Sequence, residues 1–447
     1  MKAYSNYSAT PLPWLSQIPS HWSLVRNKNI FQEVKEVVGE NADAYPLLSL
    51  TKKGIILRDV ASGKGKFPKD FNTYKIVKRG DMVLCLFDID ETPRTVGLSN
   101  FDGMLTGAYT IFHVSNINSR YAYYYYLALD NVKAMRPLYS GLRKTINTST
   151  FLGTKLPAPP REEQDQIVRF LDWKVSEINK LLNIKKHEVD ELEELKKSIV
   201  TKIVTRGLIN EPLRKSDIYW LKKVPVTWTE TKLKHILQKQ RRDVQKNADL
   251  LICSNSGEVR IRGDEKIGLV ASDDTIYQGV KKGDLLIHGM DTWHGAIGIS
   301  DYDGMCTPVV HVCTCTQSKR FVAYYLKMMA YTKVFKAISN GVRQNTSDFR
   351  SWDKVGNLFI ALPSLEEQEA IADQIDTGLS YIAQAKEKIS QEILLLEELK
   401  TKLISDVVTG NIDVRDVEIP EYEFVDEDVE SDSEAENDLD NIEEQED

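Results

Sequence analysis

The chain has 447 residues, enough for two to four domains with hydrophobic cores of their own. It contains no apolar run of membrane-spanning length, and its first residues lack the apolar block of a signal peptide, which excludes a membrane role and predicts a cytoplasmic protein. Five scattered cysteines without CxxC spacing fit a reducing compartment and no zinc knuckle.

The net charge of −8 hides an asymmetry along the chain. Residues 413–447 hold 18 acidic residues and one basic residue, Arg415, whereas residues 1–412 hold 57 basic and 48 acidic residues. The body is therefore basic, which permits nucleic-acid binding without proving it. We expect the acidic tail, 413–447, to be disordered and solvating; a regulatory mimic of DNA is the alternative.

The dominant feature is an internal duplication. Residues 162–205 recur as residues 366–409, without a gap, and both copies begin with Glu-Glu-Gln and contain Glu-Glu-Leu-Lys. Both predict long helices of about 65 Å. Ser364 and Glu367 have capping-box spacing, and Gly207 and Gly410 are stop signals.

Each helix carries an apolar stripe with the three-and-four spacing of a coiled coil. One helix alone would leave its stripe in water, so we expect the two to pair as an antiparallel coiled coil; helices of a partner protein are the competing use. The predicted coiled-coil seam consists of Ile178, Leu182, Val189, Leu192, Ile199, Ile382, Ile389, Ile393, Leu396 and Leu403.

The duplication extends into the segments before each helix. Lys-Arg-Gly-Asp at 78–81 recurs as Lys-Lys-Gly-Asp at 281–284, and Gly-Leu-Arg at 141–143 recurs as Gly-Val-Arg at 341–343. The predicted fold class is α+β: two α/β globules alternate with two long helices as a pseudo-two-fold repeat, followed by the tail. The predicted boundaries are 1–155 (first globule), 156–209 (first helix), 210–361 (second globule), 362–412 (second helix) and 413–447 (tail).

The sequence lacks the motifs of the common catalytic classes. It has no GxxxxGK[ST] phosphate loop, no GxGxxG and no [ND]PP[YF] methyltransferase motif. His288 and His294 have no neighbours at metal-ligand spacing. A magnesium ion of a nuclease could be held by Asp88, Asp90 and Glu91, but a solvated surface is the better interpretation of these residues. We expect no catalytic residue, no metal and no cofactor on this chain.

What remains is binding chemistry. Arg reads guanine edges, Asn and Gln read adenine, and Lys and Arg also bind phosphate. For any one such residue, a solvated surface charge is an equally good interpretation. The DNA-binding candidates are Lys52, Lys53, Lys64, Lys66, Arg94, Arg143, Lys144 and Asn147 in the first globule, and Arg241, Arg242, Asn255, Arg260, Arg262, Trp293, His294, Arg343, Gln344 and Asn345 in the second.

Together these features resemble the specificity (S) subunit of type I restriction-modification systems. The likeness rests on LPAPPREEQDQIV with EELKKSIV, LPSLEEQEAIA with EELKTKLI, the KRGD and KKGD segments and the two GxR segments, and covers residues 14–411. The resemblance implies that each globule is a target recognition domain reading one half of a split DNA site, while the helices set the spacer between the halves.

The resemblance also implies partners. Double-stranded DNA, two modification (methyltransferase) subunits and two restriction (translocase and nuclease) subunits would assemble with this chain, and S-adenosylmethionine, ATP and magnesium would bind to those partners. Two rivals from other classes are a coiled-coil scaffold that binds only proteins and a stand-alone nuclease. The two basic, loop-rich globules argue against the scaffold, and the missing motifs argue against the nuclease.

Overall fold

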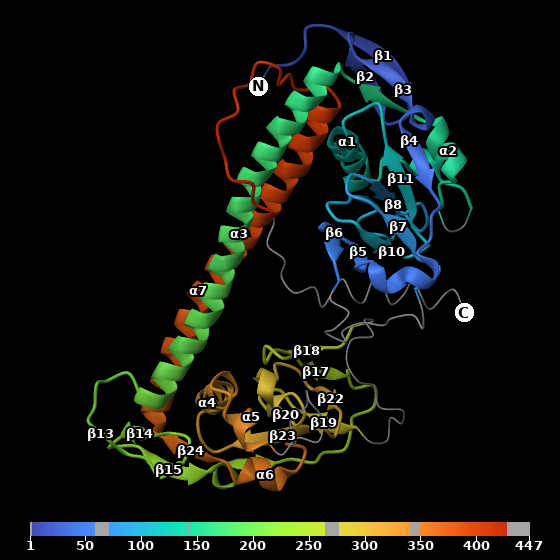
Figure 1. The fold of residues 1–447 in the computed structure, drawn as a ribbon. Coiled ribbons are helices and arrows are strands. Elements are labelled where there is room, and N and C mark those ends of the chain that lie inside the picture. The colour runs from blue at the N-terminus through green and yellow to red at the C-terminus, as the bar shows by residue number, and fades with distance from the viewer. Residues whose placement is uncertain (1, 59–70, 142–143, 264–276, 340–348, 427–447) are drawn as a thin grey trace. The chain divides into compact units, whose positions relative to one another are not determined.

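The computed structural model describes residues 2–58, 71–141, 144–263, 277–339 and 349–426 (Figure 1). Its longest elements are two helices, α3 (Arg161–Arg206) and α7 (Leu365–Val408). The chain divides into two compact units. The first unit comprises residues 1–187 and 390–447, and the second comprises residues 188–389, so that each unit contains one globule and a part of both helices.

In the first unit, an antiparallel four-stranded sheet with the order β4-β11-β8-β9 packs against helix α1 (Ser119–Asn131). Its strands are β4 (Phe31–Val34), β8 (Met82–Leu84), β9 (Val96–Leu98) and β11 (Thr110–Val114). Two-stranded ladders surround it: β1 (Tyr7–Leu12) with β2 (Leu15–Pro19), β3 (Ser23–Arg26) with β12 (Lys155–Ala158), β5 (Leu48–Thr51) with β6 (Gly54–Leu57), and β7 (Lys75–Val77) with β10 (Gly103–Leu105). Helix α2 spans Thr148–Gly153.

The second unit repeats this arrangement. Its four-stranded sheet has the order β16-β23-β20-β21, with β16 (Leu237–Lys239), β20 (Leu285–His288), β21 (Ile297–Ile299) and β23 (Val310–Cys315). Its ladders are β13 (Leu213–Lys215) with β14 (Lys223–Pro225), β15 (Thr229–Lys232) with β24 (Phe359–Leu362), β17 (Leu251–Cys253) with β18 (Val259–Ile261), and β19 (Gln278–Val280) with β22 (Gly304–Cys306). Its helices are α4 (Lys319–Tyr331), α5 (Val334–Ile338) and α6 (Trp352–Gly356).

The predicted helix signals agree with the structure. The Ser364 hydroxyl accepts a hydrogen bond from the Glu367 amide at 3.2 Å, which caps α7. Gly207 and Gly410 follow the ends of α3 and α7 with φ of +71° and +80°. A side chain at Gly410 would also collide with Pro19, because an added Cβ would lie 2.3 Å from its Cδ. These glycines end the helices where the chain turns against a globule.

Within each unit, α3 and α7 contact each other in antiparallel orientation. In the first unit, Lys185 pairs with Glu392 at 2.9 Å, and Lys400 donates to Asn179 at 2.9 Å. In the second unit, the Lys386 ammonium pairs with Glu193. The residue numbers of these contacts increase along α3 while they decrease along α7, as antiparallel helices require. Every residue of the predicted seam is buried or half-buried, with Leu182 fully inside.

The repeated Glu-Glu-Gln motif joins each globule to its helix. The Trp22 indole donates to Glu163 at 3.0 Å, and Trp228 donates to Glu367 at 3.3 Å. The next residue in each copy, Gln164 or Gln368, accepts a hydrogen bond from the backbone amide just before α1 or α4, at 2.9 and 3.1 Å. The motif is thus an anchor that fixes the orientation of a globule on its helix.

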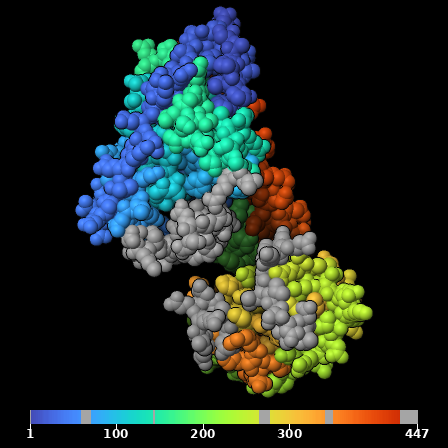
Figure 2. All heavy atoms as spheres, turned by 90° about the vertical axis from the view of Figure 1, so that its right-hand side faces the viewer, coloured from blue at the N-terminus to red at the C-terminus, as the bar shows by residue number. Residues whose placement is uncertain are grey.

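The prediction of a disordered tail is wrong for residues 413–426, which pack along α3 in the first unit. Gln166 donates to the backbone carbonyls of Val414 and Val417 at 3.0 and 2.8 Å, and Val414 is fully buried. Figure 1 shows this red segment beside the green helix α3, and Figure 2 shows red atoms, which include the end of α7, against the cyan part of the first globule. Amide and hydroxyl side chains of α3 bind this backbone, an effect that an acidic composition does not reveal. Residues 427–447 lie outside the described residues.

Candidate nucleic-acid interface

In the first unit, the turn between β5 and β6 presents two predicted DNA-binding residues, Lys52 and Lys53. Gly54 closes the turn with φ of +106°, a backbone conformation that side chains disfavour. The Thr51 hydroxyl donates to the Gly54 carbonyl at 3.0 Å and accepts from the Lys53 amide at 3.2 Å. The turn is therefore well defined, and Lys52 is exposed at its tip.

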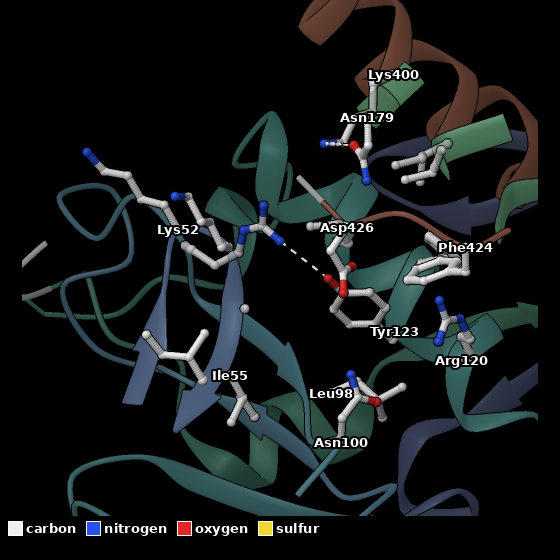
Figure 3. A pocket seen from close by; sticks show the side chains of 18 of the residues that line it. Lys52, Ile55, Leu98, Asn100, Arg120, Tyr123, Asn179, Lys400, Phe424 and Asp426 are labelled. Atoms are coloured by element: carbon white, nitrogen blue, oxygen red, sulfur yellow. Dashed lines mark hydrogen bonds between the residues drawn. The ribbon is translucent and has the colours of Figure 1, made fainter. Parts of the chain in front are cut away.

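The segment between β8 and β9 brings Arg94 beside this turn. Its guanidinium donates to the Tyr123 hydroxyl of α1 at 3.4 Å. Lys52, Lys53, Arg94 and Tyr123 line one groove, whose cavity volume is about 330 Å³ (Figure 3). Three of the sequence-predicted candidates thus gather at one site, which we name the basic groove.

The cations of the basic groove have different surroundings. Arg120 of α1 also lines it but is bound to the Asp172 carboxylate at 2.6 Å, so its charge is balanced within the fold. Burial tends to lower the pKa of Arg120, but interactions with Tyr124 and Asp172 raise it overall. Lys52, by contrast, is an exposed cation at the rim. Such a groove suits a phosphate backbone.

Other candidates of the first globule have different surroundings. The Lys144 ammonium lies 3.0 Å from Glu91 and 3.2 Å from Asp90, and these hydrogen-bonded carboxylates raise its pKa. Its charge is therefore balanced locally. Asn147 precedes α2, is exposed, and makes no side-chain capping hydrogen bond. The predicted residues Lys64, Lys66 and Arg143 lie outside the described residues.

The second unit presents candidates at the equivalent two loops. Asn255 is exposed in the turn between β17 and β18, and Trp293 and His294 lie between β20 and β21. The loops adjoin, because a Cβ added to Gly295 would lie 3.4 Å from the Asn255 carbonyl oxygen. The hairpin turn and the loop that follow the same strands in the first unit carry Lys52, Lys53 and Arg94 instead.

The arginines of the second globule divide into two kinds. Arg242 donates to the buried carboxylate of Asp284 from both terminal guanidinium nitrogens, so its charge is balanced within the fold. Arg241 and Arg260 are exposed, and Arg262 is half-buried after β18. The predicted residues Arg343, Gln344 and Asn345 lie outside the described residues.

Sequence reasoning missed several residues of the basic groove. Tyr123, Phe424 and Asp426 line it from α1 and from the C-terminal segment, and Lys400 lines it from α7. One signal was available: Arg120, Tyr124 and Asp172 recur as Arg320, Tyr324 and Asp376 at offsets of 200 and 204 residues. The C-terminal lining had no sequence signal.

The described residues contain neither a candidate metal site nor a candidate membrane span. Among them, no group of three His, Cys, Asp or Glu side chains could hold a metal ion. His288 instead lies 3.0 Å from Asp291, and burial lowers its pKa. None of the described helices has the length and hydropathy needed to span a bilayer.

Known proteins share this architecture. The family model of the type I restriction modification DNA specificity domain matches residues 95–172. The type I restriction enzyme MjaVIII specificity subunit of Methanocaldococcus jannaschii is 23% identical over 430 residues, which cover 90% of this chain and 95% of the relative. Both findings support a type I specificity subunit.

Two further similarities fit this family. The putative MjaX specificity subunit of the same organism is also 23% identical, over 446 residues, which cover 90% of this chain and 96% of that one. A solved chain from a study of type I R-M complex assembly has a TM-score of 0.60 at 12% identity, covering 88% of this chain and 99% of its own length. That likeness shows a shared fold. Specificity subunits are the non-catalytic, DNA-recognition components of their enzymes.

Proposed function

We propose that this specificity subunit reads a bipartite DNA site, one half with each globule. The observation that carries the proposal is a common scaffold with unlike side chains at equivalent loops. Both units have the same strand order, but the first presents Lys52, Lys53 and Arg94 where the second presents Asn255, Trp293 and His294. Different donors and apolar groups on one scaffold are what two readers of different sequences require.

We further propose that α3 and α7 form one antiparallel coiled coil that acts as a ruler. Two helices of 46 and 44 residues, paired along their seam, are far stiffer than a flexible linker. Grooves of one face recur every ~34 Å along DNA, so a stiff spacer selects the number of unread base pairs between the half-sites. The pseudo-two-fold repeat would give the two ends of the coiled coil equivalent surfaces.

The helices also offer docking surfaces for the two modification subunits. Large apolar side chains remain exposed on both: Leu181, Ile184, Leu394, Leu395 and Leu399 in the first unit, and Leu195 and Tyr381 in the second. Several large apolar side chains exposed on one pair of helices are typical of a protein interface. We propose that methylation of adenine, with its S-adenosylmethionine, and ATP- and magnesium-dependent cleavage by two restriction subunits reside on those partners.

Mapping of methylated adenines tests the bipartite proposal. In cells that carry this chain with its modification partner, we expect one split motif, with modified adenines in both halves. Replacing the loop residues of one globule should change one half and leave the other intact. The proposal would be contradicted if a change in one globule abolished methylation of both halves. It would also be contradicted if an active modification partner methylated no motif; this result would favour a protein-binding scaffold.

A further inference from the structure

The C-terminal segment of the chain enters the basic groove of the first unit. Phe424 and Asp426 line it together with Lys52, Lys53 and Arg94 (Figure 3). Beyond Asp426 the chain continues for 21 residues, of which 12 are acidic and none is basic. The described chain therefore ends with a carboxylate in a cationic groove, and its continuation is the most acidic segment of the sequence.

Specific hydrogen bonds hold residues 423–426, the end of this segment, on α3. The fully buried Ser176 hydroxyl donates to the Glu423 carbonyl at 3.1 Å and accepts from the Val425 amide at 2.8 Å. Asn179, which is 4% exposed, donates to the Val425 carbonyl at 3.1 Å. The path of the chain toward the groove is thus defined by buried polar contacts.

Phe424 adds a contact at the groove itself. Its ring lies 5.3 Å from the guanidinium of Arg120, within the range of a cation–π interaction. The main chain leaves this anchor at Asp426, whose carbonyl accepts from Asn183 at 3.0 Å. The acidic continuation therefore begins beside the groove cations.

The internal repeat supplies an independent argument. The donors that hold the C-terminal segment lie on α3, and α7 lacks most of them at the aligned positions. Gln166, Asn179 and Asn183 of α3 align with Ala370, Ala383 and Glu387 of α7, none of which carries a side-chain amide; only Ser176 finds an equivalent, Ser380. The two helices thus differ at the positions that bind this segment, as a dedicated binding surface requires.

We propose that residues 427–447 occupy the basic groove and compete with DNA phosphates for it. This rests on the proposed function, since it assumes that the groove binds DNA. Fully extended, 21 residues reach about 70 Å, enough to cross the face of one globule. Tethering gives the segment an effective concentration near ~1 mM, so weak individual contacts suffice. A specific site, which adds base contacts, displaces it more readily than random DNA does.

The first experiment neutralises the segment in the full-length chain. A variant with the 12 acidic residues of 427–447 changed to Asn and Gln should bind non-specific DNA about tenfold more tightly at 0.1 M salt. The difference should shrink as salt rises, because screening weakens both competitors. Unchanged affinity, with DNA binding otherwise intact, would overturn the proposal.

A second variant separates docking from simple repulsion by a distant negative charge. Ser176→Ala with Phe424→Ala releases the segment while keeping every charge. If the segment docks, non-specific DNA binding tightens several-fold; if it only repels DNA at a distance, affinity does not change and docking is refuted. Ser380→Ala, the aligned exposed position of α7, is the matched control and should behave as wild type.

Cross-linking tests docking without DNA. A zero-length carbodiimide joins a carboxylate to an amine that it touches, so mass spectrometry should find residues 427–447 linked to Lys52 or Lys53, and added DNA should remove these links. Cross-links only to lysines outside the groove would overturn the proposal. If neither the wild-type nor the neutralised chain binds DNA, the proposed function fails, while the cross-links still decide where the segment lies.

Discussion

The guanidinium of Arg120 on α1 donates to the carboxylate of Asp172 on α3 at 2.6 Å. Tyr124, a buried residue, donates to the same oxygen at 2.7 Å. The second unit repeats this contact, with Arg320 2.8 Å from Asp376. In the first unit a single carboxylate of α3 thus ties down α1, whereas in the second unit Arg320 of α4 also pairs with Glu369 and Asp373 of α7.

Removing that charge should loosen the first globule on its helix. We expect Asp172→Asn to lower the free energy of unfolding by about 1–2 kcal/mol, because two charge-assisted hydrogen bonds weaken while partial exposure of Arg120 limits the loss. Urea unfolding measures it. Glu177→Gln, at an exposed ion pair of the same helix, is the control and should cost at most about 0.5 kcal/mol. Equal losses of stability in the two variants would show that Asp172 does not anchor the globule on its helix.

The basic groove makes a prediction about DNA affinity. Lys52→Ala should weaken binding to all sequences and lower the salt slope by about one, as expected for a phosphate contact. Arg94→Ala should cost about 1–3 kcal/mol at one half-site if Arg94 reads a base. Titrations of a cognate and a scrambled duplex at several salt concentrations distinguish the two.

The matched control for this prediction is Lys144→Ala, since the charge of Lys144 is already balanced by Asp90 and Glu91. We expect a smaller change in affinity and slope than for Lys52→Ala. A larger effect at Lys144 would show that the groove is not the main phosphate contact of the first globule.

The GxR segments allow a test outside the described residues. Arg143→Ala and Arg343→Ala should each weaken specific binding by about 1–3 kcal/mol if the arginines contact bases. Because the segments belong to different globules, each change should affect a different half-site. Footprinting of both halves measures this, and unchanged affinity and preference in both variants would remove these arginines from the interface.

The elements that occur in both copies of the duplication could be predicted from the sequence. The elements that occur in only one copy could not. Ser364, Gly207 and Gly410 set helix ends by local backbone chemistry, so their roles could be inferred from spacing alone. The groove could not, because Lys52 and Arg94 meet only after β6 and β9 pack side by side. Arg242 illustrates the converse: an exposed-looking arginine of the sequence balances a buried carboxylate, Asp284.

The second unit should lose stability in mild acid. His311 is fully buried, its Nε2 lies 2.7 Å from the Phe349 carbonyl, and its Nδ1 has no partner among the described residues. Burial lowers its pKa below the unfolded value near 6.5. The unfolded chain therefore takes up the proton first, and stability falls as pH drops below about 6.5.

Between pH 7.5 and 5.5, we expect the thermal unfolding midpoint of the second unit to fall by about 2–4 °C more in the wild type than in a variant without the imidazole at position 311. His311→Gln preserves a donor for Phe349 and removes the titration, so its midpoint should depend less on pH. The exposed His235→Gln is the control. Identical pH profiles for wild type and His311→Gln would refute the assignment.

The proposed ruler makes the sharpest geometric prediction. Because Lys386 contacts Glu193 across the helix pair, an insertion in α3 keeps the seam in register only if α7 receives one opposite it. Matched insertions of whole heptads after Glu191 and Glu387 preserve the apolar pattern. One heptad lengthens the pair by about 10 Å, or three base pairs, which turns the second half-site about 100° around the duplex.

Three heptads lengthen the pair by about 31 Å, close to the ~34 Å repeat of one groove face, and so restore the facing of both half-sites. We therefore expect methylation at the original halves with about nine or ten more base pairs between them, whereas the one-heptad variant should methylate poorly. Insertion in α3 alone is the control and should unpair the helices. Altered half-sites with an unchanged spacer would show that the helices do not measure distance.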